Sequence, residues 1–246
     1  MASGDRFFNL YQHGFARVAL ATPLVRIGDP VANAAATLAL MRQAARRKAI
    51  VAVFPELGLS AYSCEDLFHQ QALLRASEEA LAWLLARTRS LPIAAFVGLP
   101  LVADGLLYNC AALVCRGKLL GLVPKTYLPN YREFYELRQF TPGADAVKSI
   151  DFAGQTAPIG PLIFRLKENR KLRLFAEICE DLWVPAPPSS HAALASATVI
   201  ANLSASNVVV GKHQYRKELA ANQSARCIAA YLYSAAGAGE STTDLA

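Results

Sequence analysis

The stretch that most constrains the fold is residues 172–183, an apolar run that changes without a linker into a cysteine and two acids. Its first part, LRLFAEI, has the apolar character of a buried β-strand. Cys179, Glu180 and Asp181 follow at once, and acidic residues are typical of the first turn of a helix. A cysteine at such a junction points its sulfur into a cleft, where the backbone N–H of Glu180 can stabilise a developing negative charge. The stretch therefore offers a candidate nucleophile, although a single cysteine is more often a buried structural residue.

The rest of the chain alternates apolar runs with helical patterns. Asp29 and Pro30 supply the N-cap and first residue of a helix that is expected to reach about residue 48. Pro100 is expected to end one strand, and Arg116 and Gly117 predict the turn of a hairpin. This alternation indicates a layered α/β fold in one domain, residues 1–246. Strands are expected at residues 16–21, 50–54, 93–99, 107–115, 118–123, 157–164, 172–178, 198–203 and 231–235, and further helices at 65–71, 73–90, 189–195 and 212–230.

Two other chemically useful side chains stand, like Cys179, directly after apolar runs. Glu56 follows the run at residues 50–54, at the kind of position where α/β folds place catalytic groups. Lys125 follows the second strand of the expected hairpin. Each residue alone is ordinary, because loop glutamates and surface lysines are usually solvated. Neighbouring strands nevertheless bring such ends together at any sequence separation, so we expect Glu56, Lys125 and Cys179 to meet in one site.

A carboxylate, an amine and a thiol in one site fit nucleophilic attack on an amide carbon. The carboxylate takes the thiol proton and later activates water, while the ammonium and the N–H of Glu180 stabilise the oxyanion of the tetrahedral intermediate. A cation beside the thiol is expected to lower the thiol pKa. Residues 126–140 mix aromatic and charged side chains, which predicts either the lining of a polar pocket or a partly buried lid.

Composition and charge argue against several classes of protein. The net charge of +6 is spread along the 246 residues, and the basic clusters lack interleaved aromatics, so no nucleic-acid partner is expected. The uncharged stretch at 182–211 is broken by Pro, Ser and Asn, so no membrane span is expected. Five cysteines without paired spacing, and charged Asp5 and Arg6 in place of a signal peptide, indicate reduced thiols and a cytoplasmic protein. No cysteine or histidine spacing predicts a metal site.

Four blocks of sequence follow one another in a specific order: residues 54–68 (FPELGLSAYSCEDLF), 124–136 (PKTYLPNYREFYE), 178–183 (ICEDLW) and 237–246 (GAGESTTDLA). The opening HGFARV at 13–18 belongs to the same pattern. Together they resemble the nitrilase superfamily of carbon-nitrogen hydrolases, and more narrowly the N-terminal glutaminase domain of glutamine-dependent NAD synthetases. The resemblance covers essentially the whole chain.

The resemblance implies a four-layer α-β-β-α sandwich with a Glu-Lys-Cys triad. Glu56 would be the general base, Lys125 the stabiliser of the oxyanion and Cys179 the nucleophile. Glu136 would orient the lysine. The family pattern has arginine where this chain has Lys212, so a bidentate contact with the substrate carboxylate would become a point-charge contact. The residues implied in the substrate pocket are Tyr62, Tyr131, Glu136, Glu180, Trp183, Ser206 and Lys212.

The resemblance also implies partners and a reaction. The substrate would be L-glutamine, and the released ammonia would serve the ATP-dependent amidation of deamido-NAD to NAD. The family continues beyond the final TTDLA with further strands and a synthetase domain, so this chain is expected to be a fragment that lacks both. No cofactor is expected here, because ATP and Mg²⁺ would bind the synthetase domain. Relatives in the family form homo-oligomers, and the same is expected of this protein.

Three other readings of the same residues stay open. A stand-alone amidase or carbamoylase would share the triad but need no groups for an α-amino acid. A glutaminase with a Cys-His pair would use His191 or His213, yet neither stands at a comparable strand end. A domain used only for assembly or regulation would not need the glutamate, lysine and cysteine.

Overall fold

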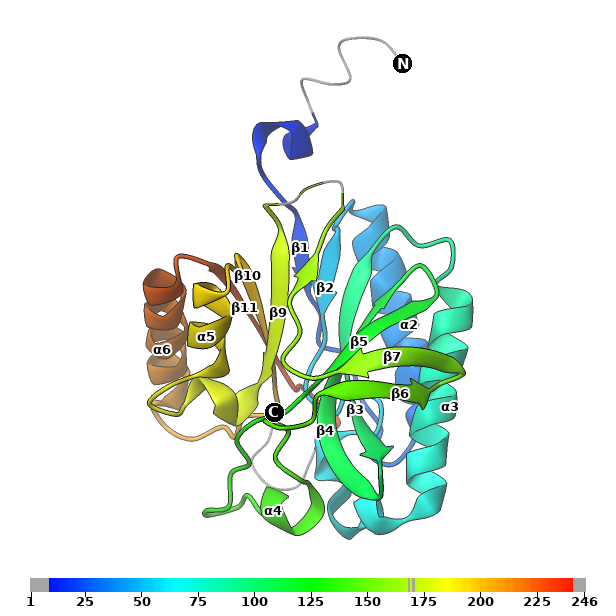
Figure 1. Cartoon of the computed structure of the whole chain (residues 1–246). Coiled ribbons are helices and arrows are strands. Elements are labelled where there is room, and N and C mark those ends of the chain that lie inside the picture. The colour runs from blue at the N-terminus through cyan, green and yellow to red at the C-terminus, as the bar shows by residue number, and fades with distance from the viewer. Residues whose placement is uncertain (1–8, 168, 170, 241–246) are drawn as a thin grey trace.

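The computed structural model describes residues 9–167, 169 and 171–240, and they form two β-sheets stacked between two layers of helices. Asp5 and Arg6 lie outside the described residues, as do the last six residues of the block at 237–246. In Figure 1, α2 and α3 lie on one side of the paired sheets, and α5 and α6 lie on the opposite side. The α-β-β-α sandwich expected from the sequence is therefore confirmed.

Sheet A is the larger sheet, with seven strands in the order β1-β2-β3-β4-β5-β7-β6. The first three strands run parallel, and β3, β4 and β5 form an antiparallel meander. The strands of sheet A are β1 (Val18–Leu20), β2 (Val51–Val53), β3 (Ala94–Ala103), β4 (Leu106–Cys115), β5 (Lys118–Pro124), β6 (Lys148–Phe152) and β7 (Gln155–Ile159).

Sheet B has four strands in the order β11-β10-β9-β8, of which the first three are parallel. They are β8 (Phe164–Arg165), β9 (Arg173–Ile178), β10 (Val199–Ser204) and β11 (Ala230–Ala235). The α-helices are α2 (Pro30–Arg46), α3 (Gln71–Arg87), α4 (Glu136–Gln139), α5 (Pro188–Leu194) and α6 (Lys212–Cys227), and the 3₁₀ segments are η1 (Leu10–His13), η2 (Tyr62–His69) and η3 (Cys179–Leu182).

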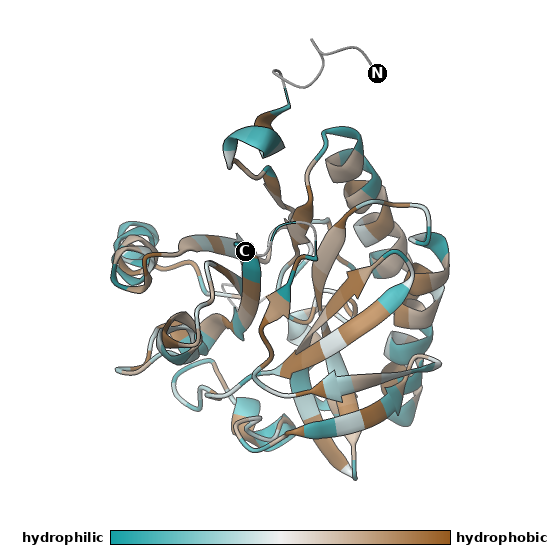
Figure 2. Ribbon diagram, turned by 45° about the horizontal axis from the view of Figure 1, so that its top comes forward, coloured by the Kyte–Doolittle hydropathy of each residue, from teal (hydrophilic) through white to brown (hydrophobic). Residues whose placement is uncertain are grey.

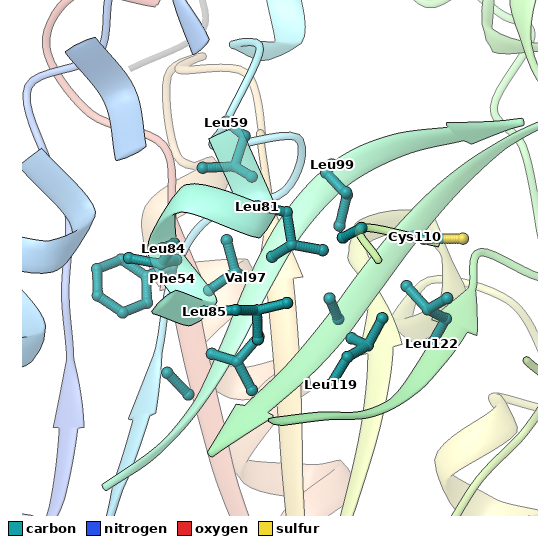
Figure 3. Packing of buried hydrophobic residues seen from close by; sticks show 14 of the residues in the cluster. Phe54, Leu59, Leu81, Leu84, Leu85, Val97, Leu99, Cys110, Leu119 and Leu122 are labelled. Atoms are coloured by element: carbon teal, nitrogen blue, oxygen red, sulfur yellow. The ribbon is translucent and has the colours of Figure 1, made fainter. Parts of the chain in front are cut away.

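Separate apolar cores hold the layers together. One core packs α2 and α3 on sheet A, and Figure 3 shows Leu81, Leu84 and Leu85 of α3 against Val97 and Leu99 of β3. A second core lies between the sheets and takes residues from both. Figure 2 shows the hydrophobic stretches along the strands. Each fully buried leucine contributes about 1.5–3 kcal/mol. The inter-sheet core includes Val53, Phe96 and Leu113 from sheet A and Ala176, Ile178 and Leu203 from sheet B.

Two expected element boundaries are wrong. Pro100 lies inside β3 instead of ending it, and β3 continues to Ala103. The carbonyls of Phe96 and Gly98 point to the side of β3 on which β2 lies, and the backbone of Pro100 faces the same side. Because β2 ends at Val53, no residue of β2 stands opposite Pro100, so the missing N–H of the proline breaks no ladder hydrogen bond.

The apolar run at residues 157–164 is not one strand. Residues 155–159 belong to β7 in sheet A, where they pair with the unexpected strand β6, and Phe164 belongs to β8 in sheet B. The chain crosses between the sheets at Gly160 and Pro161, which divides the run. Among the described residues, no helix has the length and apolar character needed to cross a bilayer.

Candidate active site

Glu56 stands in a tight loop that follows β2 and packs on β3. The N–H of Phe54 donates to Phe96 O at 3.0 Å, and the N–H of Leu59 donates to Gly98 O at 3.0 Å. A Cβ at position 98 would lie 2.4 Å from the backbone N of Leu57, so only glycine permits this approach. The side chain of Glu56 is fully buried.

Lys125 follows the last residue of β5 and is also buried. Its N–H donates to Asn109 O at 2.8 Å, and its carbonyl accepts the N–H of Gly143 at 2.8 Å. The backbone of the lysine is therefore held on both sides before its side chain enters the site. A Cβ on Gly143 would lie 2.3 Å from Pro124 Cβ, so this second glycine also allows a close backbone approach.

Cys179 is the first residue of η3, at the end of β9, as the sequence predicts. It is 6% exposed, and its φ of 44° lies in the left-handed region, which is uncommon outside glycine. This conformation turns the chain sharply from the strand into the 3₁₀ segment. The N–H groups at the start of such a segment have no partners within it, so that of Glu180 is suited to the role expected of it.

A buried hydrogen-bond network joins the two carboxylates through the lysine. Lys125 Nζ lies 2.6 Å from Glu56 Oε1 and 2.6 Å from Glu136 Oε1. Asn109 Nδ2 donates to Glu56 Oε1 at 2.7 Å, and the N–H of Ala205 donates to Glu56 Oε2 at 2.9 Å. The hydroxyl of Tyr62 donates to Glu136 Oε1 at 2.7 Å. The geometry fixes the lysine between the two acids.

Burial and the neighbouring charges set the protonation of the site. Burial alone would lower the pKa of Lys125, but the charges of Glu136 and Glu56 outweigh it and raise that pKa well above its ordinary value. Burial raises the pKa of Glu136 to about 7, against the opposing effect of Lys125. The lysine is therefore a permanent cation inside the protein.

Burial dominates the thiol pKa. Burial and the charge of Glu56 raise the pKa of Cys179 more strongly than Lys125 lowers it, so the net shift is upward. The predicted lowering effect of the adjacent cation is therefore present but outweighed. The resting cysteine is a neutral thiol, which needs a base at the moment of attack.

Electrostatic interactions link the triad to four of the residues predicted to line the substrate pocket: Tyr62, Tyr131, Glu180 and Lys212. Tyr131 Oη donates to both carboxylate oxygens of Glu180, at 3.1 and 2.9 Å. Lys212 Nζ lies 4.8 Å from the ring centroid of Trp183 and also donates to Asn207 Oδ1. Burial lowers the pKa of Lys212. Ser206, 2% exposed, follows β10 beside Ala205.

Three site residues were not predicted to act here. Asn109 contacts Glu56, Asp181 accepts backbone N–H groups, and the carboxylate of Glu240 accepts the N–H groups of Tyr62 and Ser63. Asn109 could have been noticed as the amide side chain inside the otherwise apolar β4. The described residues contain no group of three or more His, Cys, Asp or Glu placed to hold a metal ion.

The sequence of this chain is similar to those of known proteins. Residues 17–245 match the family model described as carbon-nitrogen hydrolase. A glutamine-dependent NAD(+) synthetase of Mycobacterium tuberculosis is 50% identical over 241 residues, which cover 98% of this chain and 36% of that protein. A protein of the same name from Aquifex aeolicus is 30% identical over 220 residues, covering 89% and 35%. The chain thus spans about a third of the length of these curated relatives.

Solved structures agree with this assignment. A glutamine-dependent NAD(+) synthetase from Cytophaga hutchinsonii superposes with a TM-score of 0.78 at 27% identity, over 89% of this chain and 36% of that chain. A nitrilase-superfamily amidase from Nesterenkonia gives a TM-score of 0.72 at 17% identity over 94% and 79%, a likeness of fold alone. The fold is that of the nitrilase superfamily, as expected from the sequence blocks. The chain belongs to the carbon-nitrogen hydrolase family.

Proposed function

We propose that this chain hydrolyses the side-chain amide of L-glutamine through a thioester on Cys179. The observation that carries the proposal is the buried Glu56–Lys125–Glu136 network beside a cysteine at a strained strand end. The similarity to proteins named glutamine-dependent NAD(+) synthetase supports glutamine as the amide donor.

The first half of the reaction begins from a neutral thiol. Glu56 takes the proton from Cys179 as the sulfur attacks the amide carbon, and the positive Lys125 stabilises the oxyanion that forms. When the tetrahedral intermediate collapses, the carbon–nitrogen bond breaks. Glu56 returns its proton to the departing nitrogen, which leaves as ammonia, and a thioester remains.

The second half uses the same groups. Glu56 removes a proton from water as the water attacks the thioester carbon, and Lys125 again stabilises the oxyanion. The carbon–sulfur bond breaks, and the sulfur recovers the proton from Glu56. Glutamine and water are thereby converted into glutamate and ammonia, with Cys179 restored.

The pocket residues suit an α-amino acid. The carboxylate of Glu180, held by Tyr131, supplies a negative group for the α-amino group. Lys212 and Ser206 supply a positive charge and a hydroxyl for the α-carboxylate, and Tyr62 and Trp183 form the aromatic walls. Lys212 would act as a point charge, because an ammonium lacks the bidentate geometry of arginine.

The proposal extends to the longer protein of which this chain would be one domain. Its relatives are about three times as long, so the ammonia would pass to a synthetase domain that binds ATP and Mg²⁺ and amidates deamido-NAD. That protein would be a homo-oligomer in the cytoplasm.

The decisive experiment is mass spectrometry of the protein after incubation with L-glutamine, beside a Cys179→Ala control. A glutamyl thioester on the Cys179 peptide, absent in the control, is the expected result.

Release of ammonia from glutamine should exceed its release from simple aliphatic amides, and the reverse order would favour a general amidase. Loss of activity in His191→Ala or His213→Ala, with Lys125→Ala still active, would overturn the triad. Failure of glutamine to react at Cys179 would favour a non-catalytic domain.

A further inference from the structure

Asp181, two residues after the cysteine, has a contact pattern that the proposed chemistry does not use. Its side chain is 1% exposed. Asp181 Oδ2 accepts the N–H of Ile178 at 2.9 Å, and Oδ1 accepts the N–H of Tyr127 at 2.8 Å. The N–H of Thr126 lies 3.1 Å from Oδ1 and 3.4 Å from Oδ2. One buried carboxylate thus satisfies three backbone donors.

These donors come from opposite sheets and flank two members of the triad. Ile178 ends β9 in sheet B and directly precedes Cys179. Thr126 directly follows Lys125, which emerges from β5 in sheet A. Asp181 therefore links the residue before Cys179 to the residue after Lys125, and so links an end of sheet B to an end of sheet A.

The other contacts of Lys125 and Cys179 show what this link through Asp181 adds. The backbone of Lys125 is already held by Asn109 of sheet A and by Gly143 of a neighbouring loop. Cys179 has a left-handed backbone, which requires support from its neighbours. What remains to be fixed is the placement of one strand end relative to the other, and Asp181 contacts both.

We propose that Asp181 is a positioning residue that sets the distance between the Cys179 sulfur and the Lys125 amine. The role of this distance in catalysis rests on the proposed function. The distance itself affects the reactivity of the thiol and can be tested without substrate. An uncharged side chain at this position would leave backbone donors poorly matched in a dry environment.

The test follows the reactivity of the thiol in the folded protein, with no substrate present. Wild type and Asp181→Asn are labelled with iodoacetamide from pH 6 to 10, and the Cys179 peptide is quantified by mass spectrometry. Asparagine keeps the size of the side chain but turns an N–H group towards the backbone donors. Because the nearby ammonium favours the thiolate, its displacement should lower the labelling rate of Cys179 about tenfold at any one pH in this range, which corresponds to a rise of about one unit in the thiol pKa.

Glu177→Gln is the matched control. Glu177 is also a buried carboxylate on β9, but it accepts the N–H of Ser189 at 2.8 Å and the hydroxyl of Tyr231, away from residues 126–127. This variant should lose stability without changing the labelling rate of Cys179. Asp181→Glu, which keeps the carboxylate but moves it by one methylene, should lower the labelling rate as Asp181→Asn does.

The outcomes separate this inference from the proposed function. A labelling profile of folded Asp181→Asn or Asp181→Glu that superimposes on that of wild type overturns the positioning role. Failure of both variants to fold, shown by the absence of a melting transition, assigns Asp181 to folding and also overturns it. A shifted profile in a protein that releases no ammonia from glutamine supports the positioning role while the proposed function fails.

Discussion

At the scale of single residues, the protonation of Glu136 leads to a prediction about stability and pH. Its pKa is about 7 in the fold and 4.5 ordinarily, chiefly because burial disfavours the charge. Between these values the folded protein keeps a proton that the unfolded chain has lost, so this group's contribution to stability falls as pH rises. Glu136→Gln cannot titrate, so the stability advantage of wild type over the variant should shrink from pH 5 to 7, by at most about 1.4 kcal/mol per pH unit.

Urea unfolding of both proteins at pH 5, 6, 7 and 8 measures this difference, and a constant difference would contradict the prediction. The same substitution removes one of the two carboxylates that hold Lys125, so ammonia release should fall by about 10²-fold, as expected for a misplaced catalytic group. Glu79→Gln, on the exposed face of α3, is the control and should leave both quantities unchanged.

Gly98 provides a second residue-scale prediction. In Gly98→Ala the new methyl would lie 2.4 Å from Leu57 N and 2.5 Å from Pro55 O, so the loop that carries Glu56 must move. Overpacking of this kind costs about 1–3 kcal/mol, and the displaced base should reduce kcat by about 10²-fold. Gly121→Ala is the control, because the atoms nearest to its methyl would belong to the side chains of Leu162 and Phe164 and not to backbone. If steady-state kinetics show equal kcat losses in the two variants, the effect is not specific to the base.

The sequence is informative about residues that stand at strand ends and much less so about their partners. Glu56, Lys125 and Cys179 could be predicted because each follows an apolar run. In the structure Glu56 and Lys125 contact each other, and Cys179 lies near both. The contact between Asn109 and Glu56 could not be predicted, because the two residues are 53 positions apart and their contact depends on the register of β4 in sheet A. The net direction of the thiol pKa shift could not be predicted, because burial, which the sequence does not quantify, exceeds the effect of the lysine.

At the scale of elements, the strands with continuous apolar character were predicted and the polar hairpin was not. β6 was missed because its sequence, KSIDF, alternates and is half exposed, and its partner β7 contains Pro158. One face of this hairpin is nevertheless buried, because Phe152, Ala157 and Ile159 belong to the core under α2 and α3. The helix α2 was predicted well because its signals are local: Asp29 caps the N–H of Ala32 at 3.0 Å and Pro30 opens the helix.

The segment η2 depends on a contact with the distant residue Glu240, and this gives a third prediction. Glu240 accepts the N–H of Tyr62 at 2.8 Å, the N–H of Ser63 at 3.2 Å and the hydroxyl of Ser63 at 3.0 Å. Ala61 and Glu65, on either side, have positive φ values of 72° and 46°, so the segment needs this support. Glu240→Gln should cost about 1–3 kcal/mol and, because Tyr62 binds Glu136, lower kcat/KM for glutamine by about tenfold.

Thermal unfolding and steady-state kinetics of Glu240→Gln and Ser63→Ala distinguish the contacts of this carboxylate. Ser63→Ala removes only the hydroxyl bond and should have a smaller effect on both measurements. Equal effects of the two substitutions, or a stability loss with unchanged kcat/KM, would show that Glu240 does not hold Tyr62 in place.

At the scale of the whole molecule, the site exists because two sheets are stacked in one orientation. Glu56 and Lys125 follow strands of sheet A, and Cys179 follows a strand of sheet B. The core between the sheets therefore governs the distance between base and nucleophile, whereas the core under α2 and α3 governs only sheet A. Two destabilising substitutions of equal size should consequently differ in their effect on activity.

Leu113 and Leu84 allow that comparison with identical chemistry. Leu113 is buried in the inter-sheet core and Leu84 in the core under α3, and the residues shown to contact Glu56 or Lys125 include neither of them. Each Leu→Ala substitution should cost about 2–5 kcal/mol, measured by urea unfolding. Leu113→Ala should also lower kcat by about tenfold under conditions where both variants are folded, because a shift of the sheets misaligns sulfur and base. Equal kcat values would mean that the loops at the strand ends, including the link made by Asp181, fix the site without help from the core.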